Sequence, residues 1–519
     1  MVNANDRRPC ICAAAMETAM ISASPTRSAP EHHTPLDKLK AALVTPIRAM
    51  RLRYLPLLMI YYAYGALGLV AIAEAFWVKD ALSFTPAELA AIGVWLTLPW
   101  TIKMVFGQLA DSVPILGSQR RVYVVIGASL VASGLVLMAG AAGGWIDFAA
   151  KNALYVMAQL LIVVGVVLQD VIADAMTTEV VERVRPDGTP KPKAELEREL
   201  GLVQVLGRLA LWSGILSVSG LSGWLAQIYS YETVFLFGLA IPAISLTGAM
   251  LVRLDGAERK PIDWRILGGG IVFGAVVLAI GLGGLPLGQE LVFLISLTVI
   301  ALMLYRIAED LDAVHRQRIF YAALVIFLYR SAPGVGEGYR WFTIDMLGFD
   351  EGFYGTLAQI GAGLALAGAW LFSDVITRKP IAKVLLWLTV IGTVLALPNI
   401  ALTLRLDEWT QENLGFGARA IALIDTTTES PFAELSMIPA LTLVAINAPA
   451  GRRATWFALM ASLMNVALVA GQLETKYLNL WFEVGRDAYS DLPALTIVAT
   501  IVGFVVPVAG IIAFGKRAT

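Results

Sequence analysis

The sequence predicts an all-α protein that crosses a membrane many times. Hydrophobic residues make up 58% of its 519 residues, only 15% are charged, and the mean hydropathy is +0.71. A soluble chain of this length would need charge over its surface. Apolar stretches of about 20 residues, the length at which a helix spans the hydrocarbon of a bilayer, recur from residue 54 to residue 514.

Taken in order, the apolar segments number about fourteen, and each is predicted to be a transmembrane helix. The seventh and eighth are set apart as an inserted hairpin, because two groups of six remain without them. The segments lie at residues 54–77, 88–107, 122–143, 152–181, 200–224, 231–252, 266–285, 289–306, 318–347, 354–374, 380–403, 417–447, 452–476 and 492–515.

Lysine and arginine cluster in alternate connections between these segments. Basic residues precede the first segment and follow the second, the fourth and the later even-numbered ones. The other loops hold little beyond Lys79, Lys151, Arg405 and Arg486. By the positive-inside rule, both termini are expected to be cytoplasmic, in a multi-pass protein of the bacterial inner (plasma) membrane.

The first 49 residues differ from the rest of the chain. They are rich in Ser, Pro and polar residues and lack an apolar core long enough for a cleavable signal, so they predict a disordered cytoplasmic tail. The only cysteines, Cys10 and Cys12, lie there and imply no disulfide framework. None of the three histidines falls in a predicted span, and we expect no metal, cofactor or catalytic residue.

A pattern of glycine, aspartate and basic residues occurs twice, each time after the second span of a group of six. A glycine lets two helix backbones approach, an aspartate near a helix end can cap or pair, and arginines anchor to a phosphate-rich interface. We therefore predict a gating latch on the cytoplasmic side, made of Gly107, Asp111, Arg120 and Arg121 in the first group and Asp374 and Arg378 in the second.

This repeat predicts the domain organisation. After the tail at residues 1–49, residues 50–255 form an N-terminal six-helix half and residues 316–519 a C-terminal one. Residues 256–315 supply a linker and the inserted two-helix hairpin. Two six-helix halves around a central cavity form the major facilitator fold. No P-loop pattern is present, so an ion gradient is the expected energy source.

Short motifs in both halves carry a resemblance to a known family. They include Tyr64-Gly65, Lys79-Asp80, Pro99-Trp100, Asp111-Ser-Val-Pro114 and Arg120-Arg121 in the first half, and Leu347-Gly-Phe349, Met437-Ile-Pro439 and Pro449-Ala-Gly451 in the second. Together they resemble the folate–biopterin transporter family of the major facilitator superfamily. The resemblance implies transport of a folate- or pterin-like organic anion. Residues 169–175 also resemble the muropeptide permeases, which supply the alternative substrate class.

Carboxylates within apolar spans demand a reason, because each costs at least about 2.5 kcal/mol to insert. Asp170 and Asp174 are four residues apart and therefore share a helix face, and Asp425 and Glu429 repeat this spacing on the twelfth span. We predict that both pairs take part in proton coupling. The alternative for the first pair is that Lys103 or Arg208 neutralises it and that it holds helices together.

Cations and aromatic residues in or near the spans are the complementary signal. A guanidinium binds a carboxylate bidentately and stacks on flat rings, so it suits both ends of a folate-like ligand. The predicted substrate-binding residues are Arg208, Arg330, Arg340, Tyr61, Tyr64 and Lys103. Alternatively, Glu337 pairs with Arg330 or Arg340 in a helix that proline and glycines interrupt, and the tyrosines only pack.

The sequence thus predicts a secondary active transporter that works by alternating access with proton coupling. Its partners would be a small anionic substrate, protons and the lipid bilayer, with no nucleic acid, and the protein would be a monomer. It is not expected to be an enzyme. The alternatives are a muropeptide-like permease and a non-transporting factor for membrane assembly or pigment delivery.

Overall fold

The computed structural model describes residue 48 and residues 50–185, 187–252, 261–309, 311–377, 379–433, 435–449 and 453–518. Apart from Arg48 and Met50, these residues belong to one compact unit, Arg51–Thr519. Within them the regular structure is helical, with three isolated two-residue bridges in connections. Apart from Arg48, the tail predicted at residues 1–49 lies outside the described residues.

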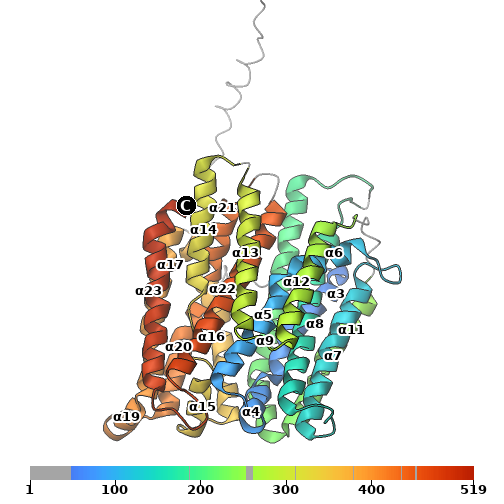
Figure 1. Cartoon of the computed structure of the whole chain (residues 1–519). Coiled ribbons are helices and arrows are strands. Elements are labelled where there is room, and N and C mark those ends of the chain that lie inside the picture. Colours follow the sequence, from blue (N-terminus) through green and yellow to red (C-terminus); the bar gives the residue numbers. More distant parts are fainter. Residues whose placement is uncertain are drawn as a thin grey trace, which may run out of the picture. The chain divides into compact units, whose positions relative to one another are not determined.

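The first eight predicted spans all appear as helices (Figure 1). Several consist of two helices that follow each other closely, and a 3₁₀ turn joins the two parts of the first span. The elements are α3 (Leu55–Ala66), α4 (Ala71–Ala81), α5 (Pro86–Thr101), α6 (Lys103–Ser112), α7 (Arg121–Gly143), α8 (Lys151–Glu179), α9 (Lys193–Ile228), α10 (Tyr231–Phe237), α11 (Ala240–Leu251), α12 (Trp264–Leu282) and α13 (Gly288–Ala308).

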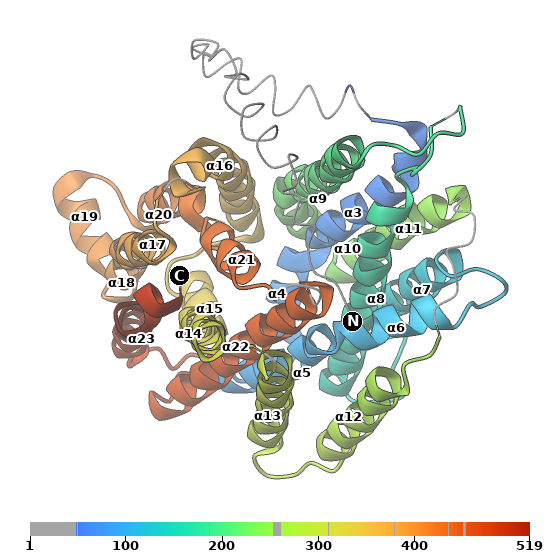
Figure 2. The same ribbon diagram turned by 90° about the horizontal axis from the view of Figure 1, so that it is seen from above.

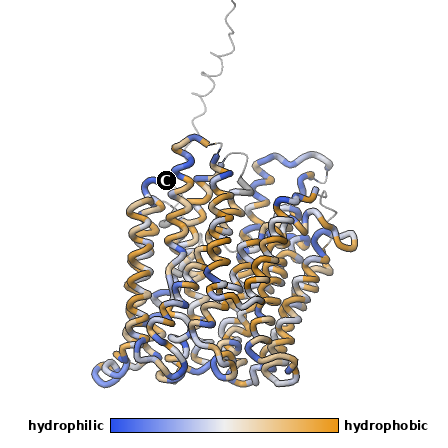
Figure 3. Tube along the Cα trace, viewed as in Figure 1, coloured by the Kyte–Doolittle hydropathy of each residue, from blue (hydrophilic) through white to orange (hydrophobic). Residues whose placement is uncertain are grey.

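The remaining predicted spans follow in the same order. The elements are α14 (Ala313–Arg330), α15 (Glu337–Asp345), α16 (Glu351–Thr377), α17 (Ile381–Leu395), α18 (Leu397–Thr403), α19 (Leu406–Leu414), α20 (Ala418–Ala433), α21 (Met437–Ile446), α22 (Arg453–Trp481) and α23 (Leu492–Ala518). In the described part of the chain, 13 helices are long and apolar enough to cross a bilayer. Figure 3 shows the hydrophobic residues between two more polar ends.

The ninth predicted span contains a stretch without helical structure. It is divided into α14 and α15 by residues 331–336, where Pro333 lacks a donor and Gly336 has a φ of 81°. Side chains of α22 support this break: Thr475 accepts a hydrogen bond from the Gly334 amide (2.9 Å), and Asn479 donates to the Val335 carbonyl (3.1 Å). The interruption predicted from proline and glycine is confirmed.

A second break, between α5 and α6, is supported by the same helix. The two helices meet at Ile102, three residues after Pro99, which lies inside α5. The backbone carbonyls of Trp100 and Thr101 accept hydrogen bonds from Asn465 (3.1 Å) and Ser462 (2.9 Å) of α22. Carbonyls that lose helix partners in the apolar interior need such donors. Both helix breaks therefore depend on α22.

Two helix pairs make the most extensive contacts between the helices α3–α11 and the helices α14–α23: α5 packs along α22, and α9 packs along α16 (Figure 2). A Cβ added to Gly223 would lie 2.5 Å from the Gly355 Cα, so glycine is required for this approach of α9 and α16. Hydrophobic clusters fill each group, around Leu135 and Phe235 in the first and around Leu459 and Trp456 in the second. The domain boundaries at residues 49, 255 and 315 stay predictions.

The predicted hairpin is formed by α12 and α13, which lie at the edge of the bundle in Figure 2. It packs on α6, α5, α14 and α22. Two polar residues at the start of α13 anchor it, because Lys476 of α22 binds Glu290 (2.6 Å) and Gln289 (2.9 Å). The outer side chains of α12, such as Leu278 and Val272, are exposed in the structure, as expected of a lipid-facing helix.

Candidate functional site

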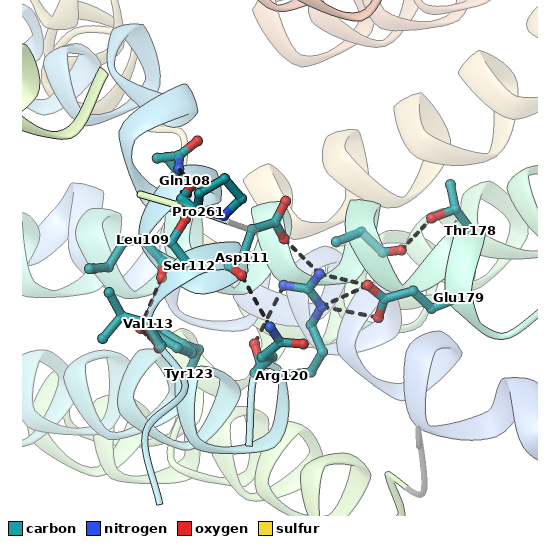
Figure 4. Close-up of polar contacts among 12 residues, drawn as sticks. Gln108, Leu109, Asp111, Ser112, Val113, Arg120, Tyr123, Thr178, Glu179 and Pro261 are labelled. Carbon is teal, nitrogen blue, oxygen red and sulfur yellow. Dashed lines mark hydrogen bonds and ion pairs between the residues drawn. The ribbon is translucent and has the colours of Figure 1, made fainter. Parts of the chain in front are cut away.

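The predicted latch of the first group is formed around Arg120. It lies at the end of the bundle that carries residues 113–120 and 187–192, which we call the basic end. The Arg120 Nη2 lies 2.7 Å from an Asp111 carboxylate oxygen and 2.6 Å from Glu179, which also accepts from Nε (Figure 4). These contacts tie α6, the start of α7 and the end of α8 together. Burial opposes the charge on Arg120, but the hydrogen bonds that Arg120 donates to Glu179 and Asp111 outweigh this effect and raise the pKa of Arg120.

The other predicted latch residues have different positions. Arg121 is exposed at the start of α7. A Cβ on Gly107 would make an ordinary 3.5 Å contact with Val171, so the expectation that close packing requires glycine there is wrong. Asp374 lies near the end of α16, where side chains are not described, and Arg378 lies outside the described residues. Sequence reasoning missed Glu179, although it ends the span that carries Asp170 and Asp174.

The first carboxylate pair lies around Lys103, the residue that begins α6 after the break at Ile102. The Lys103 ammonium lies 2.5 Å from Asp170 and 2.7 Å from Asp174, and Tyr61 donates a 2.8 Å hydrogen bond to Asp174. The two aspartates therefore share a face, as predicted. The geometry matches the alternative interpretation, in which a cation neutralises them.

Arg208, Tyr64 and Thr177 surround this pair without completing a ligand site. Arg208 lies close enough for its charge to act on Asp170. Tyr64 stacks on Trp100 and lines, with Asp170, a cavity of only about 20 Å³. The Thr177 hydroxyl is buried, donates to the Asp174 carbonyl (2.6 Å) and accepts from Gln204 (2.8 Å).

The second carboxylate pair has a different environment. Asp425 is half-buried on α20 and accepts hydrogen bonds from the Asn399 amide at 3.2 and 3.3 Å. The oxygen of Asn399 in turn accepts from the Tyr339 hydroxyl at 2.6 Å. Glu429 lies one turn further along α20 and is exposed. Among the described residues, no lysine or arginine forms an ion pair with Asp425 or Glu429.

A larger cavity of about 540 Å³ lies where α4, α5 and α8 face α14, α15 and α22. Its polar lining consists of Glu74, Tyr155, Arg330, Glu337, Arg340, Gln472 and Thr475. Arg340 pairs with Glu337 at 3.0 Å, and an Arg330 Nη lies 3.0 Å from the Met437 sulfur. Of the six predicted substrate-binding residues, only Arg330 and Arg340 line this cavity. The other four, Tyr61, Tyr64, Lys103 and Arg208, lie around the first carboxylate pair.

Glu74 is the charged residue of this lining that sequence reasoning missed. It lies in α4, and its Oε1 accepts hydrogen bonds from Tyr155 (3.0 Å) and Gln159 (2.7 Å) of α8. The signal was present, because Glu74 lies within the first apolar segment and the insertion cost applied to Asp170 applies equally to it.

The end of the bundle opposite the basic end carries contacts between the two helix groups. The Arg486 guanidinium, between α22 and α23, donates to the carbonyls of Val78 (3.2 Å), Lys79, Leu82 and Phe84 (3.2 Å). It also lies over the Trp341 ring at 4.5 Å. Lys79 pairs with Asp345 at 2.5 Å. At the basic end, by contrast, the ion pairs Arg53–Glu182 and Arg120–Glu179 join segments of the same group.

Comparisons with known proteins agree with this architecture. Residues 65–517 match the BT1 family. The folate-biopterin transporter of Synechocystis sp. is 26% identical over 472 residues, which cover 90% of this chain and 83% of that protein. Folate transporter 1 of Plasmodium falciparum is 20% identical and covers 83% of this chain and 73% of its own length.

Solved transporter structures share the fold. A POT family transporter in complex with a thioalcohol-conjugated peptide has a TM-score of 0.60 at 16% identity and covers 90% of this chain and 96% of its own. A D-xylose–proton symporter has a TM-score of 0.51 at 13% identity, with coverage of 89% and 98%. The chain is thus an integral, multi-pass membrane transporter with a major facilitator fold, and it belongs to the BT1 family.

Proposed function

We propose that this protein moves a folate- or pterin-like organic anion across the inner membrane by alternating access, driven by protons. The observation that carries the proposal is the 540 Å³ cavity between the two helix groups, with Arg330 and Arg340 in its wall. Its size is in the range of small-molecule sites, about 300–1,000 Å³. The names of the relatives from Synechocystis and Plasmodium support the substrate class.

Alternating access requires contacts between the helix groups that form and break on opposite sides of the site. The Arg486 and Lys79–Asp345 contacts are suited to this role at one end, because they join the groups through a few polar interactions. At the basic end, Arg120 with Asp111 and Glu179 makes a rigid corner that can meet the second group in the alternate state. We propose that this end is cytoplasmic, with both termini, and that the monomer is the working unit.

We propose that the second carboxylate pair, Asp425 and Glu429, carries the coupled proton. A carboxylate without a cationic partner can gain and lose a proton during the cycle without breaking an ion pair, whereas an aspartate bound to an ammonium would have to give up that contact. Asp425 has the first kind of environment and Asp170 the second. The prediction that all four carboxylates take part is therefore narrowed to Asp425 and Glu429.

Uptake by proteoliposomes tests the function. Purified protein is reconstituted, and labelled folate uptake is measured with an inward proton gradient, without one, and with a protonophore. We expect accumulation only with the gradient, and competition by unlabelled folate. If monodisperse protein takes up no folate but transports a muropeptide, the substrate class is wrong. Equal accumulation with and without the gradient would exclude proton coupling.

A further inference from the structure

The central cavity has an acidic side chain that recognition of an anion does not explain. Glu74 lies in the wall formed by the helices α3–α11, and Arg330 and Arg340 lie in the wall formed by the helices α14–α23. Arg340 and Glu337 are close enough for their charges to act on Glu74. Glu74 accepts hydrogen bonds from its neighbours, and it therefore suits a ligand with donor groups at one end.

Glu74 is held in one orientation. Both of its hydrogen bonds within the described residues, from Tyr155 and Gln159, go to Oε1. Tyr155 and Gln159 are themselves buried, and the Tyr155 ring packs edge-on against Trp77 at 6.1 Å. Because a carboxylate has acceptor sites on both oxygens, this arrangement leaves Oε2 for a ligand in the cavity.

We propose that Glu74 binds the 2-amino-4-oxo edge of a pterin ring, while Arg330 and Arg340 bind the carboxylates at the other end of a folate-like ligand. The pterin edge carries two adjacent N–H groups, which are donors only, and a carboxylate is an acceptor only. The facing charges thus select a ligand with a donor edge and an anionic tail. This inference rests on the proposed function and assigns the two ends of its substrate.

Three probes separate the two ends: folate has both, biopterin has the ring edge without the carboxylates, and p-aminobenzoylglutamate has the carboxylates without the ring. Binding of each is measured on purified full-length protein by calorimetry. Glu74→Gln keeps an Oε1 acceptor but loses the charge and turns an acceptor into a donor. We expect it to weaken folate and biopterin about tenfold or more and to leave p-aminobenzoylglutamate unchanged.

Arg340→Gln should show the reverse selectivity, with loss of p-aminobenzoylglutamate and folate and little change for biopterin. Tyr155→Phe keeps the ring packing and removes one hydrogen bond to Glu74, so it should give a smaller loss confined to the pterin-containing probes. The matched control is Glu412→Gln, which makes the same change at an exposed position on α19.

Equal weakening of all three probes by Glu74→Gln would assign Glu74 to structural support and overturn the proposal, as would unchanged biopterin binding. Either result leaves the proposed function intact, because the wild type still binds folate. A wild-type protein that binds none of the three probes would instead overturn the substrate class, and this assignment with it.

Discussion

The two carboxylate pairs have the same spacing and matching places in their helix groups, yet the structure surrounds them differently. On α8, Asp170 and Asp174 lie around the ammonium of Lys103. On α20, Asp425 contacts the neutral amide of Asn399. An acid-x-x-x-acid pattern therefore identifies a shared helix face, but it does not tell whether the partner on the neighbouring helix is a cation, as in the first pair, or a neutral amide, as in the second.

The largest effect should come from Asp425→Asn. An amide cannot carry the proton, so gradient-driven folate accumulation should be abolished, whereas exchange of labelled for unlabelled folate across the membrane should persist. Proteoliposome accumulation and counterflow are measured on the same preparation. Asp147→Asn, at an exposed position outside the predicted spans, is the control. Normal accumulation in Asp425→Asn would return this pair to a structural role.

A lysine placed beside the second pair should make it resemble the first. In Asn399→Lys, the new ammonium can reach Asp425 and hold it ionised, so we expect accumulation to fall by about tenfold or more while the protein stays folded. Uptake at several external pH values, with thermal stability on the same sample, measures this. Asn413→Lys makes the same change on the exposed end of α19. Unaltered uptake and pH dependence would show that the charge state of Asp425 does not matter.

Removing the cation from the first pair should mainly reduce stability. Lys103→Gln leaves two aspartates close together, with the Asp170 side chain 11% exposed and the Asp174 side chain 53% exposed. Because solvent screens part of the interaction, loss of the cation between them costs on the order of 2 kcal/mol. The unfolding temperature in detergent should fall by several degrees.

The double variant Lys103→Gln with Asp170→Asn should recover most of this loss, because it removes one of the two repelling charges. Lys193→Gln, whose side chain is 89% exposed, is the matched control. A wild-type unfolding temperature with defective transport in Lys103→Gln would instead favour the original assignment of Lys103 to substrate binding.

The positions of the helices could be predicted because apolar runs of about 20 residues identify spanning helices. The break at residues 331–336 followed from Pro333 and its neighbouring glycines. The sequence left two candidate cations for Asp170, Lys103 and Arg208. Lys103 reaches Asp170 because the helix breaks at Ile102, and side chains of α22 support that break. Such contacts between distant segments leave no periodic signal in the sequence. Glu74 was different, because the insertion-cost argument would have found it.

The smallest effects should come from the tyrosines beside the two pairs. Tyr61→Phe removes the 2.8 Å hydrogen bond to Asp174, which Lys103 still neutralises, so stability should fall by about 1 kcal/mol and coupling should persist. Tyr339→Phe removes the donor that orients Asn399 toward Asp425, so its stability loss should be similar but the pH dependence of uptake should shift. Tyr305→Phe, at an exposed site on α13, is the control. If both variants shifted the pH dependence equally, the first pair would also titrate during transport, and the contrast between Lys103 and Asn399 would not separate the two roles.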